Sequence, residues 1–226
     1  IPFLADAFLS VLRRFPLVMV AAAIGVVVTM FLIENEQHTD ADELVRIVLT
    51  CSLGLSSFLC AALVVEKWKM QMQVAAIPHL VALGLVLLYY FTLEVNVNVD
   101  QIITPVRFIG LNLAAHLGVA FIPYLDKTSV EDFWEYNKQL FGNFMVGAFY
   151  SLVIFAGLSI AILAVNELFN LNINGKIYGH LFVVIAGVFN TAYFLAHFPA
   201  QFNFSSETIE SQAVATTTSP YTTSFK

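Results

Sequence analysis

Five polar residues interrupt two otherwise apolar stretches of this chain, and their side chains could bind a small molecule. They are Asn112 and His116 in the first stretch and Asn190, Tyr193 and His197 in the second. Within each group the residues are three or four positions apart, which places them on one face of a helix. We expect a polar seam between the two helices. It either lines a cavity or holds the helices together by hydrogen bonds, which is the commoner use of such residues.

The sequence gives little support to other chemistry. Four histidines lie in or near the apolar stretches: His79, His116, His180 and His197. Paired imidazoles can ligate haem iron or copper, but only His79 and His197 are expected at matching depth, and neither lies in a recurring ligand motif. Ser56 and Cys60 have no partner base that would activate a nucleophile, so we interpret them as packing residues. We expect no enzyme activity, no metal site and no cofactor.

The composition indicates the class of protein in which such helices occur. Of 226 residues, 59% are apolar and only 12% are charged, and the mean hydropathy is +0.80. A water-soluble core could not bury so much apolar surface. The chain has a net charge of −6 and no basic run, so nucleic acid is not expected as a partner. We predict an all-α, polytopic transmembrane helix bundle that has the lipid bilayer as its partner.

Six apolar stretches are long enough to cross a bilayer, because a hydrocarbon core of about 30 Å needs about 20 helical residues. The predicted spans are residues 15–33, 47–65, 74–93, 108–125, 141–166 and 177–198, which form one domain over residues 1–200. Short amphipathic helices are expected in the interface at residues 3–14 and 133–141. No Asp, Glu, Lys or Arg lies in the middle of a span, which argues against a transporter that uses an intramembrane carboxylate relay.

Local signals predict how several of these helices begin and meet. Pro16 suits the first turn of the first span, because its missing N–H would be unpaired there in any case. Ser129 is expected as a helix N-cap, with Asp132 three residues later as its acidic partner. Ala21 and Gly25 are small residues four positions apart in the first span, so we expect a close approach to another helix there.

The basic residues predict the threading, because Lys and Arg collect on the cytoplasmic side of membrane proteins. If the amino terminus is cytoplasmic, seven bases lie inside: Arg13, Arg14, Lys67, Lys69, Lys127, Lys138 and Lys226. Three lie outside: Arg46, Arg107 and Lys176. On this threading the Ser/Thr-rich segment at residues 201–226 is a flexible cytoplasmic loop or tail.

The chain also resembles a known family. Residues 133–199 contain an FW-type start, an LFNLNI turn and a YFLAHFP ending, and RRFP occurs at residues 13–16. This pattern is similar to that of bacterial multi-pass inner-membrane proteins catalogued as domain of unknown function four-one-five-three. The resemblance implies a protein of the bacterial inner membrane and, because members are usually longer, an amino-terminal half of a larger chain. The Ser/Thr-rich tail departs from the family pattern. The family has no agreed activity and therefore implies no catalytic residue.

Two functions of different classes agree with these features. In the first, the seam lines a path for transport or permeation of a small molecule or lipid, which requires a cavity at membrane depth. In the second, the chain is a non-catalytic scaffold or accessory subunit of a membrane protein complex. Its tryptophans Trp68 and Trp134 and its interfacial helices would then contact other membrane protein chains.

Overall fold

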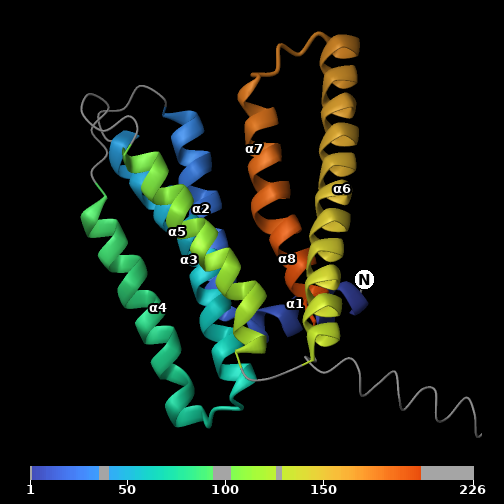
Figure 1. Ribbon diagram of the computed structural model, residues 1–226. Coiled ribbons are helices and arrows are strands. Elements are labelled where there is room, and N and C mark those ends of the chain that lie inside the picture. Colours follow the sequence, from blue (N-terminus) through green and yellow to red (C-terminus); the bar gives the residue numbers. More distant parts are fainter. Residues whose placement is uncertain (1, 36–40, 94–102, 126–128, 200–226) are drawn as a thin grey trace, which may run out of the picture.

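The computed structural model describes residues 2–35, 41–93, 103–125 and 129–199 (Figure 1). The helical elements in these residues are α1 Pro2–Arg14, α2 Pro16–Glu34, α3 Ala41–Lys67, α4 Met72–Thr92, α5 Ile103–Phe121, η1 Ile122–Tyr124, α6 Val130–Phe169, α7 Lys176–Val184, η2 Ile185–Phe189 and α8 Asn190–Ala196. Six stretches are long and apolar enough to cross a membrane, which confirms the predicted helix bundle. The predicted tail at residues 201–226 lies outside the described residues.

Helix α3 is the centre of the bundle and contacts α2, α4 and α5. Small residues line its contact with α2. A methyl group placed on Gly25 would lie 3.3 Å from Cβ of Cys51, and one placed on Gly54 would lie 3.7 Å from Cβ of Ala21. The two helices therefore approach closely, as the small residues of the first span predicted.

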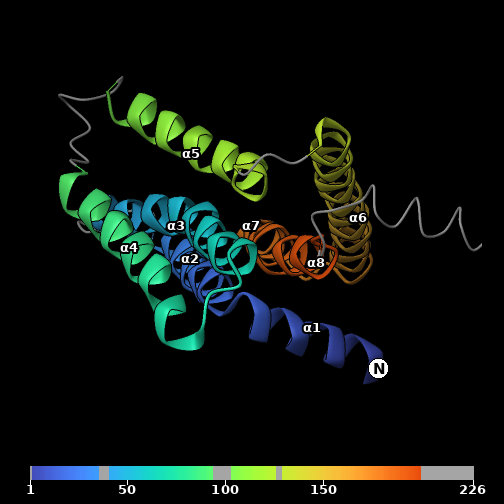
Figure 2. The same cartoon turned by 60° about the horizontal axis from the view of Figure 1, so that its bottom comes forward.

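The most deeply buried side chains gather at the end of the bundle where α1 lies crosswise to the spans (Figure 2). Tyr136 and Leu63 are 0% exposed and Phe15 is 1% exposed. The hydroxyl of Tyr136 donates to the carbonyl oxygen of Val119 over 3.0 Å, which joins the start of α6 to the end of α5. The ring of Phe15 meets that of Phe198 edge to face, with centroids 5.7 Å apart. This end of the bundle is therefore tightly packed.

Arg14 links three elements at the same end of the bundle. Its Nε and Nη2 atoms donate to the two carboxylate oxygens of Glu66 on α3, over 2.7 and 2.9 Å. Its Nη1 and Nη2 atoms donate to the carbonyl oxygens of Phe198 and Pro199, over 3.1 and 3.0 Å. The two side chains are 27% and 28% exposed, so water only partly screens the pair. Arg14 thereby fixes α1 against α3 and the end of α8.

Helix α6 differs from the sequence prediction. Residues 133–141 are not a separate interfacial helix, because they continue without a break into the apolar span as one helix of 40 residues. Ser129 is its N-cap, as predicted, and accepts a hydrogen bond from the backbone N–H of Asp132 over 3.1 Å. None of the apolar window of α6 is buried, and the helix packs on α7, η2 and α8 only along one edge. Most of its surface is therefore available to lipid.

Contacts at the opposite end of the bundle show which helix ends lie together. Lys176 Nζ donates to the carbonyl oxygen of Glu34 over 2.9 Å, and His180 Nε2 lies 2.6 Å from Glu34 Oε1. The end of α2 and the start of α7 are thus side by side, far from the Arg14 and Glu66 pair (Figure 1). Successive spans alternate in direction through the bundle (Figure 1).

The last span was expected as one regular helix over residues 177–198, but it is interrupted. It consists of α7, the π-helical segment η2 and α8. A π-helical turn contains an extra residue, so it rotates the residues after it relative to those before it. Gly187 lies in η2 against α2, where an added Cβ would be 2.2 Å from Cγ2 of Val26. The contact between α2 and η2 therefore requires glycine.

Gly187→Ala is expected to destabilise the fold by about 1–3 kcal/mol, the usual cost of overpacking a tight contact. Val26 cannot yield easily, because a β-branched side chain has one preferred rotamer in a helix. Gly157→Ala on α6 is the matched control, because nothing lies within 4 Å of its added Cβ. The control should be neutral or stabilising. Thermal unfolding in detergent measures both, and equal stability of the two variants would contradict the contact.

Arg14→Gln is expected to lower the free energy of unfolding by about 1.5–3 kcal/mol, the range for hydrogen bonds to charged groups. It removes the pairing of Glu66 and the donors to two carbonyl groups. Lys138→Gln is the control, because its pair with Glu135 lies on the surface, where the lysine is 63% exposed. Thermal unfolding in detergent measures both variants. Equal losses of stability from the two substitutions would contradict a structural role for Arg14.

Candidate functional site

A cavity of about 610 Å³ lies among α2, α3, α5, α6 and the last span. Its polar lining residues are Ser52, Ser56, Asn112, His116, Asn137, Asn190 and Thr191. The remaining lining is aliphatic or aromatic, and among the residues that the structure describes no Asp, Glu, Lys or Arg side chain lines the cavity. The site is thus an apolar chamber with a few uncharged polar groups, which is the usual make-up of a small-molecule site.

Helix α5 contributes two of the predicted seam residues to the cavity wall. His116 Nδ1 lies 2.7 Å from the carbonyl oxygen of Asn112. A carbonyl oxygen only accepts, so Nδ1 carries the hydrogen, and in a neutral imidazole Nε2 is then an acceptor. Nδ2 of Asn112 is buried without a hydrogen-bond partner among the described residues. The α5 wall therefore combines a free amide donor with an imidazole.

The last span contributes Asn190 to the cavity lining. This residue begins α8 directly after η2, and its Oδ1 atom is also buried without a partner in the described part of the chain. A buried polar atom that forms no hydrogen bond costs about 1–3 kcal/mol. The fold therefore carries two unsatisfied amide atoms on residues that line one cavity. The Asn190 oxygen itself is covered by α6, because a Cβ added to Gly147 would lie 2.9 Å from it.

Tyr193 and His197 lie elsewhere, although the sequence placed them on the same seam. Their rings pack on each other with centroids 4.3 Å apart, and Tyr193 also meets Tyr150 of α6 at 5.6 Å. Asn143 Nδ2 donates to the carbonyl oxygen of His197 over 2.6 Å. The two residues thus belong to the contact between α6 and α8, which is the packing alternative considered above.

The sequence did not identify several polar residues of the cavity wall. Ser52 and Thr191 lie in apolar runs, and Asn137 lies in the segment interpreted as interfacial. Asn137 Nδ2 bonds to the carbonyl oxygen of Phe133 over 2.9 Å, and Ser56 Oγ bonds to that of Leu53 over 3.2 Å. The Asn137 amide and the Ser56 hydroxyl therefore have partners on their own helices. The polar atoms without a partner are on Asn112 and Asn190.

Helices α5 and α6 both line the cavity but make few contacts with each other. Helix α5 packs mainly on α3 and η1, whereas α6 packs on the last span, and the two helices stand apart in both views (Figures 1 and 2). The lining residues Phe141 and Phe144 of α6 are 64% and 46% exposed. In a bilayer this side faces acyl chains, so a molecule could enter the cavity without passing through water.

The histidines considered as haem ligands do not converge. His79 lies on α4, where its Nδ1 contacts the carbonyl oxygen of Ala75 at 2.9 Å, and His197 ends α8 on the far side of α3. Within the described ranges no three His, Cys, Asp or Glu residues are grouped as a metal site would need.

A family model described as "Domain of unknown function (DUF4153)" matches residues 18–222. The match covers most of the chain and continues into the Ser/Thr-rich segment, which was expected to depart from the family pattern. The resemblance drawn from the sequence is thereby confirmed. No curated protein and no solved structure matches the chain.

Replacing the two unsatisfied amides separates a binding site from a packing contact. Asn112→Leu and Asn190→Leu remove no hydrogen bond and relieve a buried polar atom, so stability should be unchanged or higher. Asn143→Leu is the matched control, because it breaks a formed bond and should cost about 0.6 kcal/mol or more. Denaturant unfolding in mixed micelles compares the three variants. Equal losses in all three would mean that the seam only holds helices together.

Proposed function

We propose a transport function for this chain, which belongs to the family described as domain of unknown function DUF4153. In this proposal the chain takes up a lipid or a small amphipathic molecule from the bilayer. The molecule enters between α5 and α6, binds in the cavity beside Asn112, His116 and Asn190, and passes through the membrane. The chain acts as a carrier or permeation path and not as an enzyme.

The observation that most supports this proposal is a cavity among the spans whose apolar walls carry the polar residues Asn112, His116 and Asn190. If the cavity only filled a gap in packing, apolar side chains would do so at lower cost, because a hydrocarbon environment offers no replacement partner. A donor and an acceptor set in apolar walls suit a molecule with an uncharged polar head group and an apolar body.

The absence of charge from the cavity lining favours a particular class of cargo. An ionised head group without a counter-charge would meet a large desolvation cost in this cavity. An uncharged group that both donates and accepts hydrogen bonds would avoid this desolvation cost. A zwitterion whose charges remain near the opening would avoid it as well. We therefore propose neutral or zwitterionic amphiphiles, and lipids in particular, as the transported class.

The proposal includes a location and an orientation. We place the chain in the bacterial cytoplasmic membrane with its amino terminus in the cytoplasm. Among the described residues, the end with Arg13, Arg14, Lys67, Lys69 and Lys138 holds five bases, and the end with Arg46, Arg107 and Lys176 holds three. Bases are enriched on the cytoplasmic side, which supports this orientation.

The exposed surface of α6 supports a second candidate, a scaffold or accessory subunit. Gly142 and Gly157 have nothing within 4 Å of an added Cβ, so another helix could approach α6 closely there. Trp134, near its start, is 69% exposed. A scaffold role requires stable association with other membrane chains, whereas the transport role requires activity of the purified chain alone.

Transport of lipid by the purified chain distinguishes the two functions. The chain is reconstituted into phosphatidylethanolamine and phosphatidylglycerol liposomes that carry a fluorescent phosphatidylethanolamine, and an impermeant reductant bleaches dye in the outer leaflet. The wild type should make the inner-leaflet dye accessible. His116→Trp fills the cavity and should slow this exchange at least about tenfold, equal to a barrier increase of about 1.4 kcal/mol.

Leu113→Trp is the matched control, because Leu113 lies on the same helix, is 58% exposed and does not line the cavity. It should exchange dye like the wild type. No exchange by the wild type, or equal slowing by the two tryptophan variants, would contradict transport through this cavity.

A further inference from the structure

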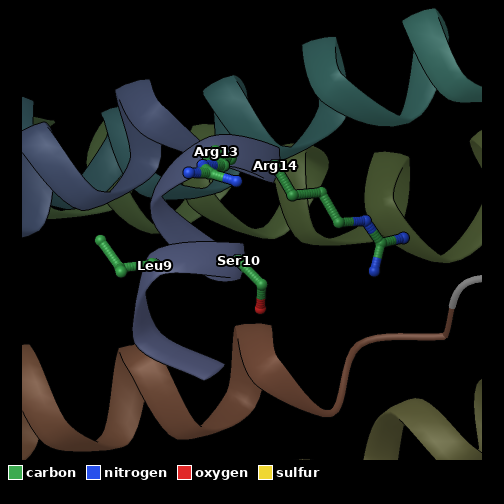
Figure 3. Close-up of a pocket in the computed structure, with 4 residues that line it drawn as sticks. All are labelled: Leu9, Ser10, Arg13 and Arg14. Carbon is green, nitrogen blue, oxygen red and sulfur yellow. The ribbon is translucent and has the colours of Figure 1, made fainter. Parts of the chain in front are cut away.

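A second hollow lies on α1, away from the cavity described above. It has a volume of about 480 Å³ and is lined by Leu9, Ser10, Arg13 and Arg14 (Figure 3). Helix α1 buries Val11, which is 2% exposed, while Phe8 and Leu9 are 41% and 48% exposed. A helix that lies crosswise at the end of a membrane bundle, with apolar side chains left uncovered, sits at the level of the lipid head groups.

The two neighbouring arginines of α1 have different roles. Three of the nitrogen atoms of Arg14 donate to Glu66 and to two backbone carbonyls, and the Glu66 carboxylate neutralises its charge. The guanidinium of Arg14 is therefore committed to the fold. Its position beside the rings of Phe15 and Phe198, 4.7 and 5.7 Å from their centroids, fixes it further.

Arg13, in contrast, is exposed and has no hydrogen bond or ion pair with any described residue. It lies one turn after Leu9 and Ser10, so these three side chains share one side of α1. Figure 3 shows Arg13 and Arg14 extending in different directions from the end of α1. The hollow thus combines one uncompensated cation, one hydroxyl and one aliphatic side chain.

We infer that this hollow binds the phosphate group of an anionic phospholipid. A guanidinium donates two parallel hydrogen bonds to phosphate oxygens. The same chemistry would bind inorganic phosphate, but the exposed Leu9 beside the cation provides a contact that only the acyl or glycerol part of a lipid would use. We therefore assign the site to a lipid.

This assignment is independent of the proposed transport function. The head-group site lies on α1, outside the bundle, whereas the cavity lies among the spans, and no residue lines both. A lipid bound here would hold α1 in the membrane surface beside the Arg14 and Glu66 pair. The site could exist in a scaffold as well as in a transporter.

Native mass spectrometry of the full 226-residue chain in detergent tests the site with two added lipids and one free ion. The probes are phosphatidylglycerol, phosphatidylcholine of the same chain length, and inorganic phosphate. The wild type should retain phosphatidylglycerol in preference to phosphatidylcholine. Arg13→Gln should weaken phosphatidylglycerol binding about tenfold, because a hydrogen-bonded charge contributes at least about 1.4 kcal/mol.

Lys69→Gln is the matched control for total charge. Lys69 is an exposed base in the turn after α3, near the same end of the bundle, and does not line the hollow. This variant should bind phosphatidylglycerol like the wild type, and the thermal unfolding of both variants should match the wild type. Equal retention of the two lipids by the wild type, or equal losses in the two variants, would overturn the assignment. Displacement of the lipid by millimolar inorganic phosphate would overturn the choice of a lipid over a free ion.

Discussion

Every backbone N–H and C=O group within the hydrocarbon layer must find its partner inside the protein, because lipid provides none. This constraint explains why the described part of the chain is built from helices, and why the interruption of the last span at residues 185–189 is a π-helical turn that keeps its backbone hydrogen-bonded. Pro16 lies in the first turn of α2, where no hydrogen bond is lost. The same constraint applies to the side-chain amides of Asn112 and Asn190, which have no hydrogen-bond partner among the described residues. In a hydrocarbon environment an unpaired side-chain group costs as much as an unpaired backbone group.

The helices pack tightly at the Arg14 end of the bundle, and α5 and α6 are not packed together away from that end. The ring contacts among Tyr124, Tyr136 and Phe198 and the hydrogen bonds of Arg14 join α1, α3, α6 and α8 at this end. Helix α6 is thus anchored near its start through Tyr136, while the rest of it packs only on the last span. The space between α5 and α6 follows from this arrangement: the two helices are held together at their linked ends and are not packed together beyond them (Figure 1).

The periodicity of the sequence was sufficient to predict the helices but not their rotation about their own axes. The six spans, the N-cap at Ser129 and the close contact of α2 with α3 depend on local composition, which the sequence states directly. The seam did not emerge as one unit, because Tyr193 and His197 belong to the contact between α6 and α8 and do not line the cavity. Asn190 lines the cavity, but its amide oxygen also lies against Gly147 of α6. The π-helical turn at residues 185–189 rotates the helix face on which the residues after it lie. No residue type in the sequence indicates such a turn. The continuity of α6 was missed for a related reason, because a polar amphipathic segment can be a separate surface helix or the first turns of a span.

The central claim is that a bilayer-facing cavity between α5 and α6 holds an amphipathic molecule against Asn112 and Asn190. A density map of the chain in lipid nanodiscs measures this directly. The account predicts elongated density in the cavity, with its polar end within hydrogen-bonding distance of both amides and its apolar end emerging past Phe144. An empty cavity closed by direct packing of α5 on α6, with the two amides bonded to each other, would contradict it.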